Sequence, residues 1–579
     1  MTSLALILLM WLAVIIALGQ RQSGIQAASE VKQGYVGSAA CAQCHLDIYN
    51  EYMQTSMGRS MSQLTPAMLK KMPLPGTYDD PKLNRHFSVY AENGKLYQSE
   101  FQTDAAGKDV FRDIRQLQWK IGAGENGYGL LLERDNYLFQ APLSFYSQAS
   151  AWGLSPGYEF ADYGFNRPIL AGCIICHSGN PRPVSSTNGR YESPPFSEAA
   201  IGCERCHGPG ARHLHSMQSA AGRATKEHFI VNPAHLSSIL ANNICMYCHQ
   251  TGDVRVLQPG KAYKDFIPGE PLDDTLAILK VPPTRESPPD DDHVEHYYSM
   301  TLSKCYRASG GRLRCITCHD PHVEPAQQQA PAYFNRKCLT CHTNQSCSLP
   351  MEARRQSKPA DNCIGCHMPK REIRVISHSS ATNHRILRKP GEPFPDVTFE
   401  QTLPSLPDLI HLDPAPGKTG ATLPLLTRLQ AYGELAENKP GYLAPYLKIL
   451  DQLSQSEPEN SLVQAALGRR DLKGGNYLKA ADHLQHSLHL DPEQPAVAGD
   501  LADALQKLGK VEQAVVLLSK SVEQDPFNPA LRKKLIVAYI TLRQYGNAET
   551  AIEQYLQIFP QDSFMRQMLV RAQQAPASQ

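Results

Sequence analysis

Cysteine and histidine occur together in this chain in one repeated pattern, Cys-X-X-Cys-His. Fourteen of the sixteen cysteines belong to it. The seven copies occupy residues 41–45, 173–177, 203–207, 245–249, 315–319, 338–342 and 363–367. Side chains at this spacing could hold a structural zinc ion, form a thiol redox pair, or attach a haem through two thioether bonds.

The haem interpretation accounts for every element of the pattern. A c-type haem bonds to both cysteines, the two-residue gap sets their separation along a helical turn, and the adjacent histidine supplies the proximal nitrogen to the iron. Structural zinc sites combine paired motifs and leave the next residue free to vary, whereas all seven motifs here end in histidine. A thioredoxin-like site needs only one or two such pairs. The sequence therefore predicts seven covalently bound c-type haems.

The iron ligands fall into two sets. The expected attachment and proximal residues are Cys41, Cys44, His45, Cys173, Cys176, His177, Cys203, Cys206, His207, Cys245, Cys248, His249, Cys315, Cys318, His319, Cys338, Cys341, His342, Cys363, Cys366 and His367. A low-spin electron-transfer haem also needs a distal ligand, usually histidine or methionine. The candidate distal ligands are Met57, His213, His215, His235, His293, His296, His322, His378 and His384.

Position along the chain favours some of these candidates. His213 and His215 follow the third motif after a Gly-Pro-Gly turn, in "CERCHGPGARHLH", and His322 follows the fifth motif, in "CITCHDPH". Met57, which follows the first motif, could equally be a core methionine on a helix. Three other histidines are expected not to bind iron, namely His86, His228 and His411.

Cys305 and Cys347 lie outside the motifs and flank the fifth and sixth of them. In an oxidising compartment two spare cysteines could form a disulfide. Because the sequence does not give the distance between their Cα atoms, a bridge and two separate thiols both remain open.

The N-terminus carries an apolar run at residues 4–19, followed by small residues around Ala27. This pattern predicts that residues 1–27 are a signal peptide or an uncleaved membrane anchor. Either interpretation places the rest of the chain outside the cytoplasmic membrane, in the periplasm or beyond, where c-type haems are attached.

Three regions are expected after this segment. Residues 28–390 form the seven-haem domain, in which a small antiparallel β insert at 84–146 contains hairpins at Asn93-Gly94 and near Asp135-Asn136. Residues 391–420 are Pro-rich and lack periodicity, which predicts a linker.

Residues 421–575 contain no cysteine and repeat every 34 residues. The period is marked by Pro424, Pro458, Pro492, Pro526 and Pro560, and also by Ala480, Ala514 and Ala548 and by Leu467, Leu501 and Leu535. This period is typical of tetratricopeptide repeats, which are stacked helical hairpins. Three repeats are clear, a fourth at about 424–457 is degenerate, and 561–575 is expected to be the closing helix. The predicted fold is a multihaem cytochrome, mostly α and irregular with a small β insert, followed by an all-α repeat solenoid.

Roughly residues 35–390 resemble the multihaem cytochrome c-554 family, particularly its exported members fused to tetratricopeptide repeats. The resemblance rests on "CAQCHLDIYNEYMQTSM", "LSPGYEF", "CERCHGPGARHLH", "KCYRASGGRLRCITCHDPH" and "CIGCHMPKR". It implies electron transfer through closely packed bis-histidine haems, with distal ligands from His213 or His215, from His322, and from His378 or His384. This chain has Met57 where the family often has a histidine after the first haem, which leaves the ligation of that haem open.

The expected function is electron transfer between redox partners, with the repeats docking a partner protein or a second copy of the chain. The alternative is a multihaem oxidoreductase that binds a small nitrogen or sulfur compound at one open-coordination haem, such as that of the first motif. Nearly equal numbers of basic and acidic residues, 57 and 56, exclude a strongly basic nucleic-acid binder. Membrane contact is expected only through an uncleaved N-terminal segment.

Overall fold

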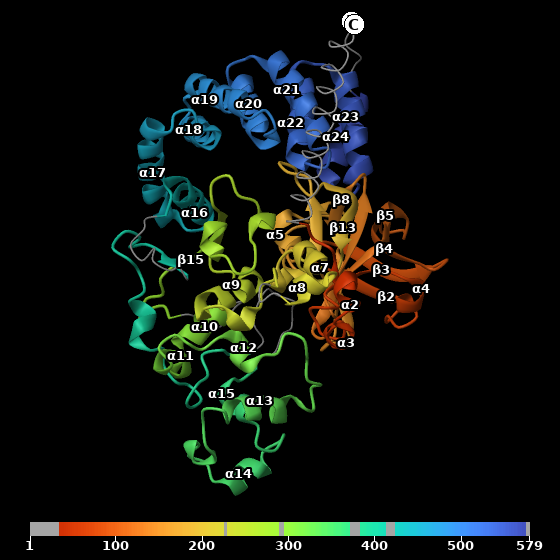
Figure 1. Cartoon of the computed structure of the whole chain (residues 1–579). Helices are drawn as coiled ribbons and strands as arrows, with labels where there is room; N and C mark the ends of the chain where they lie inside the picture. The colour runs from red at the N-terminus through yellow and green to blue at the C-terminus, as the bar shows by residue number, and fades with distance from the viewer. Residues whose placement is uncertain (1–33, 225–227, 289–294, 371–381, 413–422, 575–579) are drawn as a thin grey trace, which may run out of the picture.

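The computed structural model describes residues 34–224, 228–288, 295–370, 382–412 and 423–574. Three regions follow one another (Figure 1): a β-rich region in red to gold, a centre of short helices and loops in yellow to green, and an arch of paired helices in blue. The expected signal or anchor segment lies outside the described residues. Across the described ranges, no helix has the length and apolar character needed to cross a membrane.

A four-stranded antiparallel sheet forms the first part of the β-rich region. Its strands, in spatial order, are β2 (Gly76–Asp80), β3 (Arg85–Glu92), β4 (Lys95–Thr103) and β5 (Asp109–Leu117). At the turn between β3 and β4, Asn93 and Gly94 have φ angles of 50° and 72°, the left-handed values that a two-residue hairpin of this kind requires. This predicted hairpin is confirmed.

A second antiparallel sheet has seven strands. Five lie in the order β1 (Met61–Gln63), β6 (Trp119–Ile121), β7 (Gly127–Arg134), β8 (Tyr137–Gln140) and β11 (Arg167–Pro168), while β9 (Leu143–Tyr146) pairs with both β7 and β10 (Ala151–Leu154). Asp135 and Asn136 join β7 to β8 with φ angles of 53° and 65°. The second predicted hairpin is therefore also confirmed.

The sheets reach well beyond the small insert expected at 84–146, so that expectation was wrong in extent. A two-stranded sheet of β12 (Asn180–Pro183) and β13 (Tyr191–Glu198) continues the β-rich region, and β14 (Val254–Leu257), β15 (Leu276–Lys280) and β16 (Ile410–His411) form another sheet. Several strands of the β-rich region, namely β1, β11 and β12, are two to four residues long, and two of them contain proline. Such segments carry too little alternation to be recognised, and they are strands because of long-range pairing.

The Cys-X-X-Cys-His motifs lie on short helical turns. They occupy or adjoin α2 (Ser38–Ala42), α5 (Ala171–Ile174), α6 (Glu204–His207), α9 (Ser238–His249), α12 (Cys315–Cys318), α13 (Ala330–Cys338) and α15 (Cys363–His367). The remaining helices of this region are α3 (Leu46–Tyr52), α4 (Pro66–Leu69), α7 (Ala211–Met217), α8 (Ala220–Ala224), α10 (His296–Leu302), α11 (Lys304–Ala308) and α14 (Met351–Gln356). The 3₁₀ turns are η1 (Pro233–His235), η2 (Tyr263–Asp265), η3 (Leu272–Asp274), η4 (Asn344–Ser346) and η5 (Asp396–Phe399).

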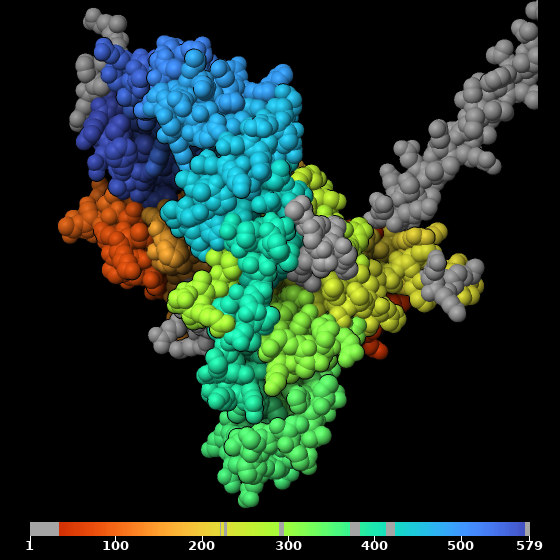
Figure 2. All heavy atoms as spheres, turned by 90° about the vertical axis from the view of Figure 1, so that its left-hand side faces the viewer, coloured from red at the N-terminus to blue at the C-terminus, as the bar shows by residue number. Residues whose placement is uncertain are grey.

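The part of the centre that carries the last three motifs has little core of its own. Among the described residues from Lys304 to Ile386, none is buried. Figure 2 shows the green lobe around α13, α14 and α15 projecting at the end of the molecule opposite the blue helices. A segment of this size normally needs buried apolar area to stay folded. The haems expected from the sequence would supply apolar area of this kind.

The C-terminal region consists of four helical hairpins and a closing helix, as the period predicted. The helices are α16 (Leu425–Asn438), α17 (Leu443–Ser456), α18 (Ser461–Lys473), α19 (Tyr477–Leu490), α20 (Pro495–Lys507), α21 (Val511–Gln524), α22 (Pro529–Thr541), α23 (Tyr545–Ile558) and α24 (Ser563–Gln574). Ala480, Ala514 and Ala548 are completely buried, since only a small side chain fits where these helices cross.

The solenoid contacts the rest of the chain at both ends (Figure 1). At its start, Leu429 and Tyr432 of α16 share a core cluster with Val254 of β14 and Leu279 of β15. The same cluster contains Leu406, which belongs to the segment expected to be a Pro-rich linker. That segment also contributes β16, which pairs with β15, so part of it is packed rather than a free connection.

At the other end, Phe527 lies between α21 and α22 and inserts into the β-rich region. Its ring centroid is 5.0 Å from those of Tyr137 and Phe139, both in edge-on geometry, and the Arg134 guanidinium lies 4.3 Å from the centroid of its ring. Asn166 Nδ2 adds a 2.7 Å hydrogen bond to the carbonyl of Ile558 at the end of α23. The last repeats are therefore bound to the chain's own β-rich region.

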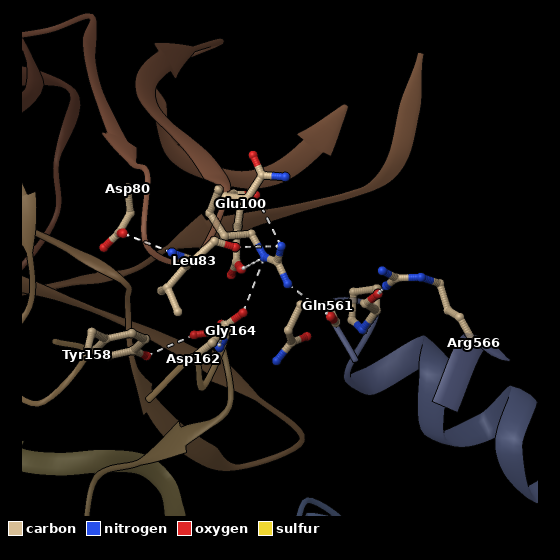
Figure 3. A network of polar contacts seen from close by, with 11 residues as sticks. Asp80, Leu83, Glu100, Tyr158, Asp162, Gly164, Gln561 and Arg566 are labelled. Carbon is tan, nitrogen blue, oxygen red and sulfur yellow. Dashed lines mark hydrogen bonds and ion pairs between the residues drawn. The ribbon is translucent and has the colours of Figure 1, made fainter. Parts of the chain in front are cut away.

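A buried ionic network continues this interface (Figure 3). Arg85 Nε lies 3.5 Å from Glu100 and 3.3 Å from Asp162, and Arg85 Nη2 donates a 3.1 Å hydrogen bond to the carbonyl of Gln561 beside α24. Burial, followed by the nearby Asp162 charge, raises the pKa of Glu100 well above its usual value. The protonated form of the Glu100 carboxyl is therefore more favoured in the folded protein than in the unfolded chain.

We expect Glu100→Gln to stabilise the protein at high pH and to have little effect at low pH. Because the folded pKa is raised, the stability contributed by Glu100 is fully present below its unfolded value of about 4.3 and is lost as pH rises through the folded value, by ~1.4 kcal/mol per unit of pKa difference. The glutamine side chain mimics the protonated carboxyl and does not titrate. Urea unfolding of both proteins from pH 4 to 9 measures this, and a difference between them that stays constant across the range would contradict it.

Candidate haem sites

Motifs that are distant in the sequence lie against one another. The Cys41 thiol hydrogen-bonds with Cys203, which joins the first motif to the third, and Cys176 contacts Cys248, which joins the second to the fourth. The contact with Cys41 lowers the pKa of Cys203 to about 6, and the contact with Cys248 lowers that of Cys176 to about 6. The first motif therefore lies against the third, and the second motif lies against the fourth.

The other motifs continue this series. Cys245 hydrogen-bonds with Cys315, joining the fourth and fifth motifs, and its charge also acts on Cys206 of the third. The charge of Cys341 acts on Cys318, and that of Cys363 on Cys338, which brings the fifth, sixth and seventh motifs together. The motifs therefore follow the order 1, 3, 4, 5, 6, 7, with the second motif beside the fourth.

Several histidines make the same kind of hydrogen bond. The ring Nδ1 contacts a backbone carbonyl in His207, His213, His296, His367 and His384, at distances of 2.7, 2.6, 3.1, 2.7 and 2.9 Å in that order. A carbonyl oxygen only accepts, so Nδ1 must carry the proton and Nε2 must carry the lone pair. This arrangement is typical of metal-binding histidines, in which the second nitrogen fixes the tautomer and the ring orientation.

A first cluster of histidines surrounds the third motif. His207 lies 6.0 Å from His322 between ring centroids, and the two rings are only 15° from parallel. Burial lowers the pKa of His207, and His322, His45 and His213 reinforce that shift, so all four rings are close together. Metal–imidazole bonds are about 2 Å long, so two rings on opposite sides of one iron have centres about 6 Å apart. The cluster thus contains two motif histidines and two additional ones.

A second cluster has the same composition at the fourth and fifth motifs. The ring centroid of His384 is 6.4 Å from that of His319 and 4.7 Å from that of His296, and His296 lies 5.3 Å from His249. Burial first, and then the neighbouring imidazoles, lower the pKa of His296 to about 3 and that of His319 to about 4. These rings stay neutral at physiological pH, which is the form that binds a metal.

The other distal candidates are not gathered in this way. His215 and His235 are exposed, and Met57 lies in the loop after α3, next to Ser56, which hydrogen-bonds Glu324. His293 and His378 lie outside the described residues. His86 and His411 contact carboxylates instead, Asp79 and Asp273 respectively, each at 2.8 Å.

The two cysteines outside the motifs are separate thiols in this structure. Cys305 lies near Cys341 and Cys318, which belong to the sixth and fifth motifs. Cys347 instead lies near Cys363 of the seventh motif. The two side chains therefore face different motifs.

The surroundings of the third motif fit a porphyrin. An open pocket of about 420 Å³ lies beside His207, and its lining consists of Gly208, Pro209, Arg212, Phe229, Ile230 and Val231, mainly apolar with one guanidinium. Among the described residues, no three His, Cys, Asp or Glu side chains converge as a bare metal ion would need. A porphyrin brings its own equatorial nitrogens, so two axial histidines suffice.

Two residues near the motifs were not identified from the sequence. Arg255 of β14 lies 3.9 Å from the Cys176 sulfur and donates a 2.6 Å hydrogen bond to the Tyr247 carbonyl, a position suited to a haem propionate. No sequence signal marks it, because arginine is common throughout the chain. Glu204 lies inside the third motif and is 4% exposed, and an acidic residue between two haem cysteines was the signal available for it.

Comparison with known sequences identifies a matching family model and several relatives. A family model described as tetratricopeptide repeat matches residues 471–533. Multiheme cytochrome MtrA of Shewanella baltica (strain OS185) is 22% identical over 195 residues, which cover 32% of this chain and 56% of the relative. C-type polyheme cytochrome OmcB of Geobacter sulfurreducens (strain DL-1 / KN400) is 25% identical over 197 residues, covering 29% of this chain and 24% of the relative. The chain thus spans less than two thirds of the length of either relative.

Solved structures resemble this chain only in part. The APC/C hetero-tetramer Cut9-Hcn1 matches with 19% identity and a TM-score of 0.24, covering 26% of this chain and 30% of the other. The crystal structure of MamA matches with 18% identity and a TM-score of 0.23, covering 24% and 82%. Scores this low carry no argument about fold or function. What the sequence comparisons establish is that the chain is distantly similar to multihaem c-type cytochromes and carries tetratricopeptide repeats near its C-terminus.

Proposed function

We propose that this protein is an exported seven-haem c-type cytochrome that transfers electrons between redox partners. The observation that carries the proposal is the pair of histidine clusters, each with two motif histidines and two additional ones. Two irons in each cluster would receive one proximal and one distal imidazole, which produces the low-spin, bis-histidine haem of electron-transfer proteins.

The ligand pairs follow from the ring positions. His207 and His322 would bind the iron of the third motif, and His319 and His384 that of the fifth, because their centroid separations match two ligands on one metal. His249 would then take His296, and His45 would take His213. With His213 rather than Met57 as its distal ligand, the iron of the first motif would have no open coordination position. This weakens the case for an oxidoreductase that binds its substrate at that iron.

The order of the motifs supports conduction along the molecule. Electrons would pass between neighbouring haems, and the protein would set each potential through axial ligands and burial. The line ends in the projecting lobe, where Cys341, His342 and Cys366 are exposed. A partner protein could approach these two terminal haems closely.

The repeats have a narrower role in this proposal than the sequence indicated. Because both ends of the solenoid are bound to the chain's own sheets, a redox partner or second copy would have to use the remaining faces, where Leu478 and Val516 are 62% and 73% exposed. Residues 1–27 would direct the chain across the cytoplasmic membrane, as a cleaved signal or as an anchor. The periplasm is the proposed location.

We expect the intact protein to carry seven haem adducts by mass spectrometry, and electron paramagnetic resonance of the oxidised form to show at least four low-spin irons. Chemical denaturation that leaves the haems attached confirms the thioether bonds. Fewer than seven adducts would refute the cofactor assignment. A high-spin iron that binds nitrite or hydroxylamine would instead favour the oxidoreductase.

A further inference from the structure

The carboxylate of Glu204 receives backbone hydrogen bonds from two distant segments. Its Oε1 accepts from the N–H of Gly210 at 2.7 Å, its Oε2 accepts from that of Gly37 at 2.8 Å, and the N–H of Val36 lies 3.0 and 3.1 Å from the two oxygens. The side chain belongs to the third motif and is almost fully buried. Backbone donors of this kind stabilise a carboxylate in its charged form.

Each bonded segment leads directly into a ligand-bearing helix. Val36 and Gly37 precede α2, which carries Cys41 of the first motif, and Gly210 precedes α7, which carries His213. Glu204 itself lies in α6 beside His207. One carboxylate therefore connects the attachment site of the first haem, the proximal ligand of the third, and the histidine assigned above to the first iron.

The surrounding backbone is shaped to admit this carboxylate. A Cβ atom at position 210 would lie 3.1 Å from Glu204 Oε1 and 3.1 Å from the Val36 side chain, closer than about nine in ten real contacts of this type. Gly37 has a φ of 77°, a left-handed value that glycine adopts without strain. A further hydrogen bond joins the segments of the first and third motifs, since Ser38 Oγ accepts from the N–H of Cys203 at 2.9 Å.

We propose that Glu204 is a positioning residue for the haems of the first and third motifs and that its buried charge lowers the reduction potentials of both. This inference rests on the proposed haem function. A ferric haem carries one more positive charge than a ferrous haem, so a nearby anion in a poorly solvated setting stabilises the oxidised state.

Glu204→Gln separates this role from simple packing, because it keeps the shape and removes the charge. In a redox titration of the full-length holoprotein, followed by electron paramagnetic resonance, we expect two of the seven potentials to shift in the positive direction. Glu204→Asp keeps the charge and should shift them much less. Glu100→Gln is a control for the substitution itself, since it also replaces a buried glutamate with glutamine but lies in β4, away from the motifs, and should shift none.

Wild-type potentials in a Glu204→Gln protein that retains seven haems would overturn the proposal. If that variant loses haems, Gly210→Ala takes its place, because the added Cβ displaces the carboxylate without removing its charge. Altered resonance signals of two low-spin irons would then support the proposal, and unchanged signals would overturn it. A wild-type protein without seven haems would refute the proposed function itself, which keeps the two failures distinct.

Discussion

Replacing His384 with glycine should convert one low-spin iron to high spin, and adding imidazole should reverse the change. The ring of His384 lies 6.4 Å from that of His319, and its Nδ1 is held by the Thr382 carbonyl, so its Nε2 is oriented as an axial ligand. Glycine removes the ring and leaves space that free imidazole can occupy. We therefore expect about one iron per molecule to change, and the potential of that haem to differ from the wild-type value.

The measurement is electron paramagnetic resonance of the oxidised holoprotein with and without imidazole, together with a haem count by mass spectrometry. His411→Gly is a matched control, because this histidine is also partly buried but its Nε2 is bound to Asp273. It should leave the number of low-spin irons at the wild-type value. A His384→Gly protein with as many low-spin irons as the wild type would show that the fifth haem takes its distal ligand from another residue.

Replacing Phe527 with alanine should release the end of the solenoid from the β-rich region. The ring fills a site between Tyr137, Phe139 and Arg134, so its loss removes both apolar contact and a cation–π interaction. Truncation of a core phenylalanine costs about 3–5 kcal/mol, and because this ring is only partly buried we expect about 2–4 kcal/mol.

Urea unfolding of the holoprotein measures this loss, and protease sensitivity of α22 to α24 locates it. Val516→Ala is the matched control: its side chain is 73% exposed on α21, and its loss should change stability by less than about 0.5 kcal/mol. Haem content should be unchanged in both variants, because the contact lies away from the motifs. An equal effect of the two substitutions would mean that the interface contributes little to the fold.

Local patterns in the sequence were sufficient for much of the architecture. The hairpins at Asn93-Gly94 and Asp135-Asn136 were predictable because a two-residue turn with left-handed backbone selects these residue types. The helical hairpins were predictable because each repeat buries the same small residues at the same step, as Ala480 shows. The short strands β1, β11 and β12 could not be found in this way, since two to four residues carry no recognisable period.

The candidate haem sites were also predictable from the sequence only in part. The seven motifs were evident from the residue order alone, because two cysteines and a histidine must lie within one helical turn to serve one haem. The sequence also limited the candidate distal ligands to a short set of histidines and Met57. The folded chain shows that His213 and His322 lie close to His207 and that His384 lies close to His319. It also shows that Glu204 joins the first and third motifs. Those contacts link residues up to 168 positions apart, and long-range packing, rather than local spacing, brings them together.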